Sequence, residues 1–112
     1  MANRLHLHKP MLQVLANASP KMRKAILHHA DKALIQTLSE CVLNVSKGNV
    51  NMSECVKKKL KKYKHKFRSI LNPKTRWNRK KRIFVQHGGF LSVLLPTLAS
   101  IIPGLVSHFL SK

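Results

Sequence analysis

Basic side chains concentrate in residues 56–82, and their type and spacing point to the binding of a polyanion. This segment holds fourteen of the twenty-two Lys and Arg residues of the chain and contains no Asp or Glu. Fixed positive charges at this density attract nucleic acid, an anionic membrane surface or an acidic protein. The candidate nucleic-acid-binding residues are Lys57, Lys58, Lys59, Lys61, Lys62, Lys64, Lys66, Arg68, Lys74, Arg76, Arg79, Lys80, Lys81 and Arg82.

The rest of the chain does not neutralise this segment. The formal net charge is +19 over 112 residues, because only Asp31, Glu40 and Glu54 are acidic. Such a chain repels itself in solution, so we expect a stoichiometric anionic partner, with double-stranded DNA as the first candidate and RNA as an open alternative. Lys outnumbers Arg and contacts phosphate as a point charge, so binding should depend little on base sequence. Trp77 is a further candidate for contact with a nucleic acid or a partner.

The residue types needed for catalysis or for a metal site are not grouped in this sequence. Three scattered acids form no carboxylate pair for acid–base chemistry, and no Gly-rich loop precedes a helix to hold a phosphate. We therefore assign no catalytic residue, metal or cofactor, and we expect no enzymatic activity. A zinc site would have to combine residues whose spacings match no known ligand pattern, namely His6/His8, His28/His29, Cys41 and Cys55.

Two cysteines are too few for a disulfide framework. Charged and polar residues near the N-terminus interrupt any apolar run that could act as a secretory signal. We therefore expect a reducing, intracellular compartment. Cys41 falls on the apolar face of an expected helix, which favours a buried thiol.

Periodicity and capping signals predict an all-α fold, because no segment alternates as a strand would. Start signals and stop signals define expected helices over about residues 10–15, 20–29, 32–47, 54–71 and 75–87. The start signals are Pro10, Ser19-Pro20, Asp31, Ser53 and Thr75, and the stop signals are Gly48, Asn72-Pro73 and Gly88-Gly89.

The expected helix over residues 54–71 explains how the cations are presented. Its apolar residues step by three or four and form a stripe roughly 120° wide, so Lys and Arg occupy the rest of its circumference. Such a helix can bury only its stripe and must offer its cationic flank to a partner. The stripe consists of Val56, Leu60, Tyr63, Phe67, Ile70 and Leu71.

The segments divide into a helical bundle, a basic helix and an uncharged hydrophobic tail. We expect a flexible N-terminus (residues 1–9), a small helical domain that includes the start of the basic tract (10–72), a basic helix ending in Gly-Gly (73–89) and a Pro-interrupted tail (90–112). So small a core is expected to be marginally stable without a partner. The predicted core residues are Met11, Leu15, Met22, Ile26, Leu34, Leu38, Val42, Val45, Leu60 and Phe67.

After residue 82 the chain changes from a basic segment to an uncharged one. The segment around this change resembles the C-terminal half of adenovirus core protein X, the precursor of the mu peptide. The order of segments in the whole chain is similar to that of the X-like proteins of adintoviruses and Maverick/Polinton elements. The matching features cover about thirty residues: Arg79-Lys80-Lys81-Arg82, Gly88-Gly89, Leu94-Leu95-Pro96, Ile101-Ile102 and Pro103-Gly104. This chain departs from mu in being rich in Lys and in carrying a folded N-terminal region, so residues 10–55 inherit no role from mu.

The resemblance implies a virion core protein that condenses viral double-stranded DNA, located in the virion and the host nucleus. In that family a viral cysteine protease cuts after a Gly-Gly, which corresponds here to cleavage between Gly89 and Phe90, after Gly88. The same glycines could instead simply end a helix. The tail would then contact capsid protein, other copies of the chain or, through residues 90–110, a membrane.

Two other functions stay open. The first is a membrane-active or membrane-anchored minor virion protein, in which the basic region docks on anionic lipid and residues 90–110 insert. That segment is long enough to span a bilayer, although Pro96, Pro103 and Gly104 interrupt it. The second is a sequence-specific helix-turn-helix regulator, which is weaker because residues 57–71 offer almost only Lys where a recognition helix needs Asn, Gln or Arg.

Overall fold

The computed structural model describes residues 8–48, 50 and 52–98, and within them all regular structure is helical, which confirms the predicted all-α class. The remaining residues, including 1–7 of the expected N-terminal segment and 99–112 of the expected tail, lie outside the described part. The helices are α2 (Lys9–Asn17), α3 (Pro20–His28), α4 (Lys32–Ser46), α5 (Glu54–Lys61), α6 (Lys64–Leu71), α7 (Trp77–His87), the 3₁₀ helix η1 (Gly88–Phe90) and α8 (Leu91–Thr97).

Capping side chains mark three of the helix starts in the described residues, as the sequence predicts. Ser19, Asp31 and Ser53 each accept a hydrogen bond from a backbone N–H in the first turn of the helix that follows, which satisfies a donor that the helix itself cannot. The distances are 3.2 Å for Met22 N to Ser19 Oγ, 2.9 Å for Leu34 N to Asp31 Oδ1 and 3.3 Å for Val56 N to Ser53 Oγ. Thr75 was expected to cap α7, but the N-cap is Arg76 and no side chain caps it.

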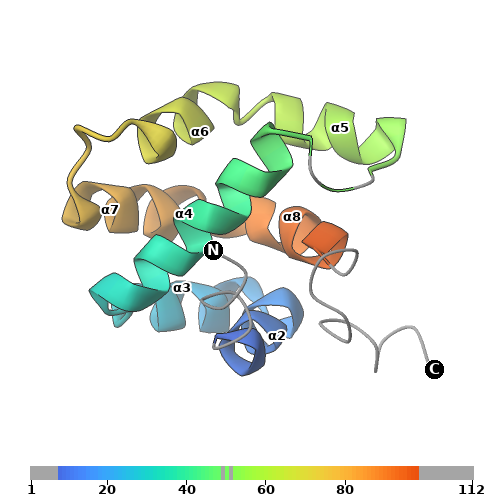
Figure 1. The fold of residues 1–112 in the computed structure, drawn as a ribbon. Helices are drawn as coiled ribbons and strands as arrows, with labels where there is room; N and C mark the ends of the chain where they lie inside the picture. The colour runs from blue at the N-terminus through green and yellow to red at the C-terminus, as the bar shows by residue number, and fades with distance from the viewer. Residues whose placement is uncertain (1–7, 49, 51, 99–112) are drawn as a thin grey trace.

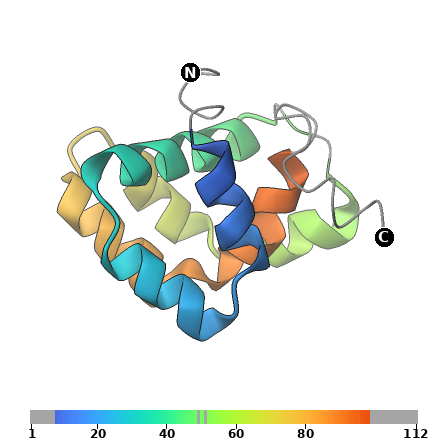
Figure 2. The same cartoon turned by 90° about the horizontal axis from the view of Figure 1, so that it is seen from below.

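Helix α4 is the central element of the fold. It crosses the molecule diagonally and packs against α6, α7 and α8 (Figure 1). Helix α3 packs against α7, and α2 lies against α8, as the view from below shows (Figure 2). Helices α5 and α6 form the opposite edge of the molecule, above α7 and α8 in Figure 1. Gly48, the predicted stop signal of this helix, follows α4 and has a left-handed backbone conformation (φ +74°).

Residues 90–98, which the sequence placed in a separate hydrophobic tail, lie in the core. Phe90, Leu94 and Leu95 are at most 1% exposed, and α8 packs against α2, α4 and α5. Phe90 is the centre of an aromatic cluster, with ring centroids 5.3 Å from Tyr63, 5.0 Å from Phe67 and 5.8 Å from Phe84. Thus the basic helix and the start of the tail complete the bundle that residues 10–72 were expected to form alone. No helix in the described residues is long and apolar enough to cross a membrane.

The basic helix expected over residues 54–71 is two helices, because the chain breaks between Lys61 and Lys64. Tyr63 has φ −98° and ψ 11°, outside the helical region. The break lets the apolar stripe serve two neighbours: α5 packs against α8, whereas α6 packs against α4 and α7. One straight helix could not reach both surfaces. The end of α6 at Asn72, before Pro73, is as predicted.

Helix α3 is rotated relative to the sequence-based expectation. Met22 was predicted to lie inside but is 55% exposed, whereas Arg23 is 8% exposed. The Arg23 guanidinium donates a hydrogen bond from Nη2 to the carbonyl of Ala18 at 3.3 Å, so its aliphatic stem is buried while its head ties α3 to the end of α2. Met11 is likewise 38% exposed, and the neighbouring Leu12 is buried in its place.

The other predicted core residues lie inside. Ile26 is half-buried against the core, and the remaining seven are buried. They are Leu15, Leu34, Leu38, Val42, Val45, Leu60 and Phe67.

Candidate nucleic-acid interface

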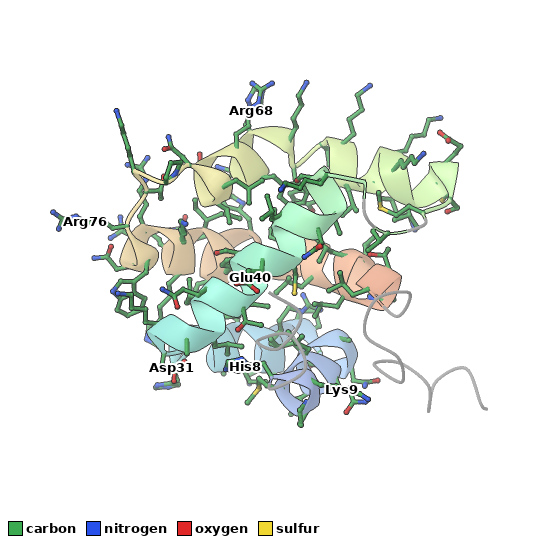
Figure 3. The ribbon with its side chains drawn as sticks, viewed as in Figure 1. His8, Lys9, Asp31, Glu40, Arg68 and Arg76 are labelled. Atoms are coloured by element: carbon green, nitrogen blue, oxygen red, sulfur yellow. The ribbon has the colours of Figure 1, made fainter. Side chains whose placement is uncertain are left out.

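Helices α5 and α6 present a row of cations along one edge of the molecule. Of the eight basic residues from Lys57 to Arg68, only Lys66 is half-buried and the others are exposed. Figure 3 shows Arg68 pointing away from the body of the protein on the outer side of α6. The apolar stripe faces inward, so the two helices hold these charges out as the sequence predicts.

The loop between α6 and α7 continues this surface with Lys74 and Arg76. The Asn72 side chain accepts a hydrogen bond from the backbone N–H of Lys74 at 2.9 Å, and the Asn72 carbonyl accepts one from Thr75 N at 3.0 Å. Such a side-chain-to-backbone turn fixes the path of a short loop. Arg76 projects outward from the start of α7 (Figure 3).

Helix α7 adds four further cations and lines a polar cleft with α6. Arg79 and Arg82 are exposed, and Lys80 and Lys81 are half-buried. The cleft has a volume of about 410 Å³, and a second hollow of about 440 Å³ adjoins it at the loop, because Ser69, Asn78 and Arg79 line both. The side chains of the first are Lys66, Ser69, Asn78, Arg79, Arg82, Ile83, Gln86 and His87.

The composition of this cleft suits a phosphate backbone. Lys66, Arg79 and Arg82 supply positive charge, while the hydroxyl of Ser69 and the amides of Asn78 and Gln86 supply neutral donors. Phosphates in protein–nucleic-acid complexes are bound by this mixture of charged and neutral donors. Sequence reasoning identified the cations but missed the neutral residues, although Asn78, Arg82 and Gln86 recur every four positions and so share one face of a helix.

Trp77 begins α7 on the other side of this helix, next to α4. It is 38% exposed, and the Lys81 ammonium lies 5.8 Å from the centroid of the indole ring. A hollow of about 630 Å³ lies beside it, lined also by Lys32, Gln36 and Lys80. An exposed indole flanked by cations can stack on a base or a partner side chain, so contact through Trp77 stays a prediction.

Few carboxylates border the cationic surface. Asp31 caps α4 and Glu40 lies within that helix, both away from the outer side of α5 and α6 (Figure 3). Glu54 lies in the first turn of α5, with its Oε1 3.5 Å from the Nζ of Lys57. The Glu54 side chain is 90% exposed, so this ion pair contributes little to stability. Most of the positive charge on the surface therefore stays uncompensated.

The predicted cleavage site lies in a helical segment, in which Gly89 is exposed between two buried neighbours. Gly88 is buried, Phe90 is 1% exposed, and both belong to the 3₁₀ helix that joins α7 to α8. A Cβ added at Gly88 would lie 2.9 Å from Leu27 Cδ1, so the missing side chain lets the α7–α8 junction pack closely on α3. Cleavage between Gly89 and Phe90 stays a prediction, and it would require this helical segment to become extended. Helix α7 ends at His87, directly before Gly88-Gly89, as the predicted stop signal requires.

The cysteines and histidines of the described residues form no metal site. No three His, Cys, Asp or Glu residues gather there in a way that could hold a metal ion. Burial, together with the neighbouring charge of Glu40, raises the pKa of Cys41 to about 12. Cys41 is therefore a protonated core thiol, as predicted, whereas Cys55 is exposed. His6, which the sequence offered with His8 as a possible zinc ligand, lies outside the described residues.

Comparison of the chain with protein-family models, with curated proteins and with solved structures finds no match.

Proposed function

We propose that this protein binds and condenses double-stranded DNA through phosphate contacts that do not depend on base sequence. The observation that carries this proposal is the density of cations on α5, α6, the α6–α7 loop and α7, which hold fourteen basic residues, eleven of them exposed, and one acidic residue, Glu54. A phosphate backbone is the partner that supplies negative charge at a matching density.

The dimensions of the molecule support condensation rather than simple binding. Its longest extent is 39 Å, which corresponds to about 11 base pairs, or roughly 23 phosphates, at 3.4 Å per base pair. The net charge of +19 is close to that number. One chain on each such length of duplex would therefore neutralise most of the DNA charge, and this removes the repulsion that keeps duplexes apart.

The place of this activity follows from the resemblance to adenovirus core protein X. On that basis we propose a virion core protein that acts on viral DNA in the virion and the host nucleus. Contacts with capsid protein, with other copies or with membrane are assigned to the apolar residues beyond the described helices, because Phe90, Leu91, Leu94, Leu95 and Leu98 are buried in the core.

Salt titration of duplex binding tests the proposal. If about ten cations contact phosphates, the logarithm of the binding constant should fall with the logarithm of salt concentration at a slope of about −9. The double variant Arg79→Gln/Arg82→Gln should make this slope about two units shallower. The matched variant Lys21→Gln/Lys24→Gln, on exposed positions of α3, should leave it unchanged. Binding that persists unaltered near 1 M salt would contradict a phosphate-based mechanism.

The exposed face of α7 favours a second candidate function, sequence-specific recognition. Asn78, Arg82 and Gln86 lie on one face, and Asn, Gln and Arg are the residues that read purines in the major groove. Helix α6, the loop and α7 also supply the helix–turn–helix order that such a regulator needs. Selection from a random pool of duplexes separates the two functions: a recovered consensus favours recognition, and its absence favours condensation.

A further inference from the structure

A trough with an apolar floor runs beside the outer edge of α5 and α6. Residues of α5 and α6, together with Val45 and Ser46 at the C-terminal end of α4, line it, and its volume is about 380 Å³. Its floor contains two half-buried side chains, Met52 and Leu71, which leave apolar surface open to solvent. The other floor residues are Val45, Leu60 and Phe67.

Four exposed cations line the trough, two on each helix. Lys57 and Lys61 are four residues apart on α5, and Lys64 and Arg68 are four residues apart on α6. Each pair therefore lies on one face of its helix. The two pairs flank the break at Tyr63 and together form a row of four positive charges beside the apolar floor.

The combination of floor and row restricts what can occupy the trough. A nucleic-acid backbone would satisfy the four cations but would leave the apolar floor in contact with water or phosphate. A second copy of the chain offers only three acidic residues in total, and residues 99–112 contain Lys112 as their one formally charged side chain and no acid. Neither can match a row of four positive charges. The partner must carry apolar and acidic residues together.

We propose that this trough binds an acidic amphipathic helix of a partner protein. Apolar side chains at intervals of about i, i+4 and i+7 would enter the trough, and carboxylates on the flank of the same helix would face Lys57, Lys61, Lys64 and Arg68. The proposal goes beyond DNA binding, because it assigns the floor a role that phosphate contacts do not have. Since the row is also part of the cationic surface, the helix and DNA compete for these four residues.

Fluorescence anisotropy with the full-length protein tests this directly. The probe is a labelled designed helix with Leu at i, i+4 and i+7 and Glu along one flank; the control is a peptide of the same composition in shuffled order. We expect the amphipathic peptide to bind at least about tenfold more tightly than the shuffled one. Equal affinities would mean simple charge attraction and would overturn the proposal.

Matched variants locate the binding. Met52→Gln should weaken the peptide about tenfold and leave DNA affinity unchanged, whereas Met22→Gln, the same change at an exposed position on α3, should do nothing. Lys61→Gln/Lys64→Gln should weaken both ligands, and Lys21→Gln/Lys24→Gln should weaken the peptide by less than twofold. If Met52→Gln fails to fold, the comparison of Lys61→Gln/Lys64→Gln with Lys21→Gln/Lys24→Gln still tests the proposal. Full peptide affinity in Met52→Gln or in Lys61→Gln/Lys64→Gln would overturn the proposal.

A lipid is the remaining occupant with both apolar and acidic parts. Binding to phosphatidylglycerol vesicles is therefore measured with the same variants. If Met52→Gln weakens vesicle binding as much as peptide binding, the trough is a lipid site and the proposal fails. Vesicle binding that does not respond to Met52→Gln supports a protein helix as the ligand.

Discussion

Gly88 and Gly89 are adjacent in the chain, but only Gly88 is surrounded by packed side chains. A Cβ at Gly88 would meet buried Leu27 at 2.9 Å, while one at Gly89 would meet nothing within 4 Å. We therefore expect Gly88→Ala to lower the free energy of unfolding by about 1–3 kcal/mol, because Leu27 is confined in the core.

Gly89→Ala is the control for this prediction. It should be neutral or raise stability by up to about 1 kcal/mol, because alanine loses less backbone entropy in a helix. Denaturant unfolding of the two variants measures both values. Equal stabilities would show that the α7–α8 junction does not pack closely on α3.

The buried thiol of Cys41 should make the stability of the chain depend on alkaline pH. The folded chain holds the Cys41 proton up to a pKa of about 12, whereas the unfolded chain releases it near 9.0. Between these values a rise in pH favours the unfolded state, so the Cys41 contribution to stability is constant below pH 9 and is lost above it. Unfolding in denaturant at a series of pH values should show this loss in the natural chain.

The Cys41→Ala variant isolates the contribution of this thiol. It should lose less stability above pH 9 than the natural chain, because every other residue is common to the two proteins. An identical pH dependence of the two proteins would mean that Cys41 is not a buried thiol.

Arg23 shows why some individual residues could not be placed from the sequence. Periodicity gave α3 correctly, but hydrophobicity alone turned Met22 inward and Arg23 outward. The hydrogen bond from Arg23 to Ala18 joins α3 to α2, and a pattern within one helix carries no information about such a contact. The buried cation was therefore hidden from sequence analysis.

At the scale of elements, local signals predicted helix starts, but they did not indicate that α8 packs into the core. Caps such as Ser19 and Asp31 act within one turn, so their residue types alone predict where helices start. The break at Tyr63 and the burial of α8 depend on which helices meet in space. The cationic side chains on α5 and α6 could be predicted from the sequence, because the apolar stripe of each helix turns inward and leaves them exposed. The cleft between α6 and α7 could not be predicted, because it depends on how these two helices pack together.

Helix α8 should be essential to the fold, although the sequence reads as a detached tail. Leu95 is fully buried, so Leu95→Ala should lower the free energy of unfolding by about 2–5 kcal/mol through lost contacts and a cavity. Ser92→Ala, on the exposed side of the same helix, should change it by less than about 1 kcal/mol. Thermal unfolding followed by circular dichroism measures both. A small effect of Leu95→Ala would restore the view of residues 90–98 as a separate tail.

The whole molecule carries a large positive charge around a small core, and this sets the conditions under which it is stable. With +19 charges over 112 residues, repulsion between exposed lysines opposes folding at low ionic strength. Added salt screens these charges, since the Debye length falls from about 10 Å at 0.1 M to about 3 Å at 1 M. We therefore expect the unfolding temperature to rise with salt, by about 4–8 °C for each 1 kcal/mol of repulsion removed.

Substitution of neighbouring lysines on α5 tests whether repulsion on the cationic surface is the cause. Lys57→Gln/Lys58→Gln/Lys59→Gln should unfold at a higher temperature than the natural chain at low salt and should gain less from added salt. The matched variant Lys57→Arg/Lys58→Arg/Lys59→Arg keeps the charge, so its salt dependence should equal that of the natural chain. If the two triple variants respond alike, the effect of salt lies elsewhere than in charge. If the Gln variant alone loses the response, the same repulsion is what a bound polyanion would relieve, and DNA should stabilise the fold in proportion.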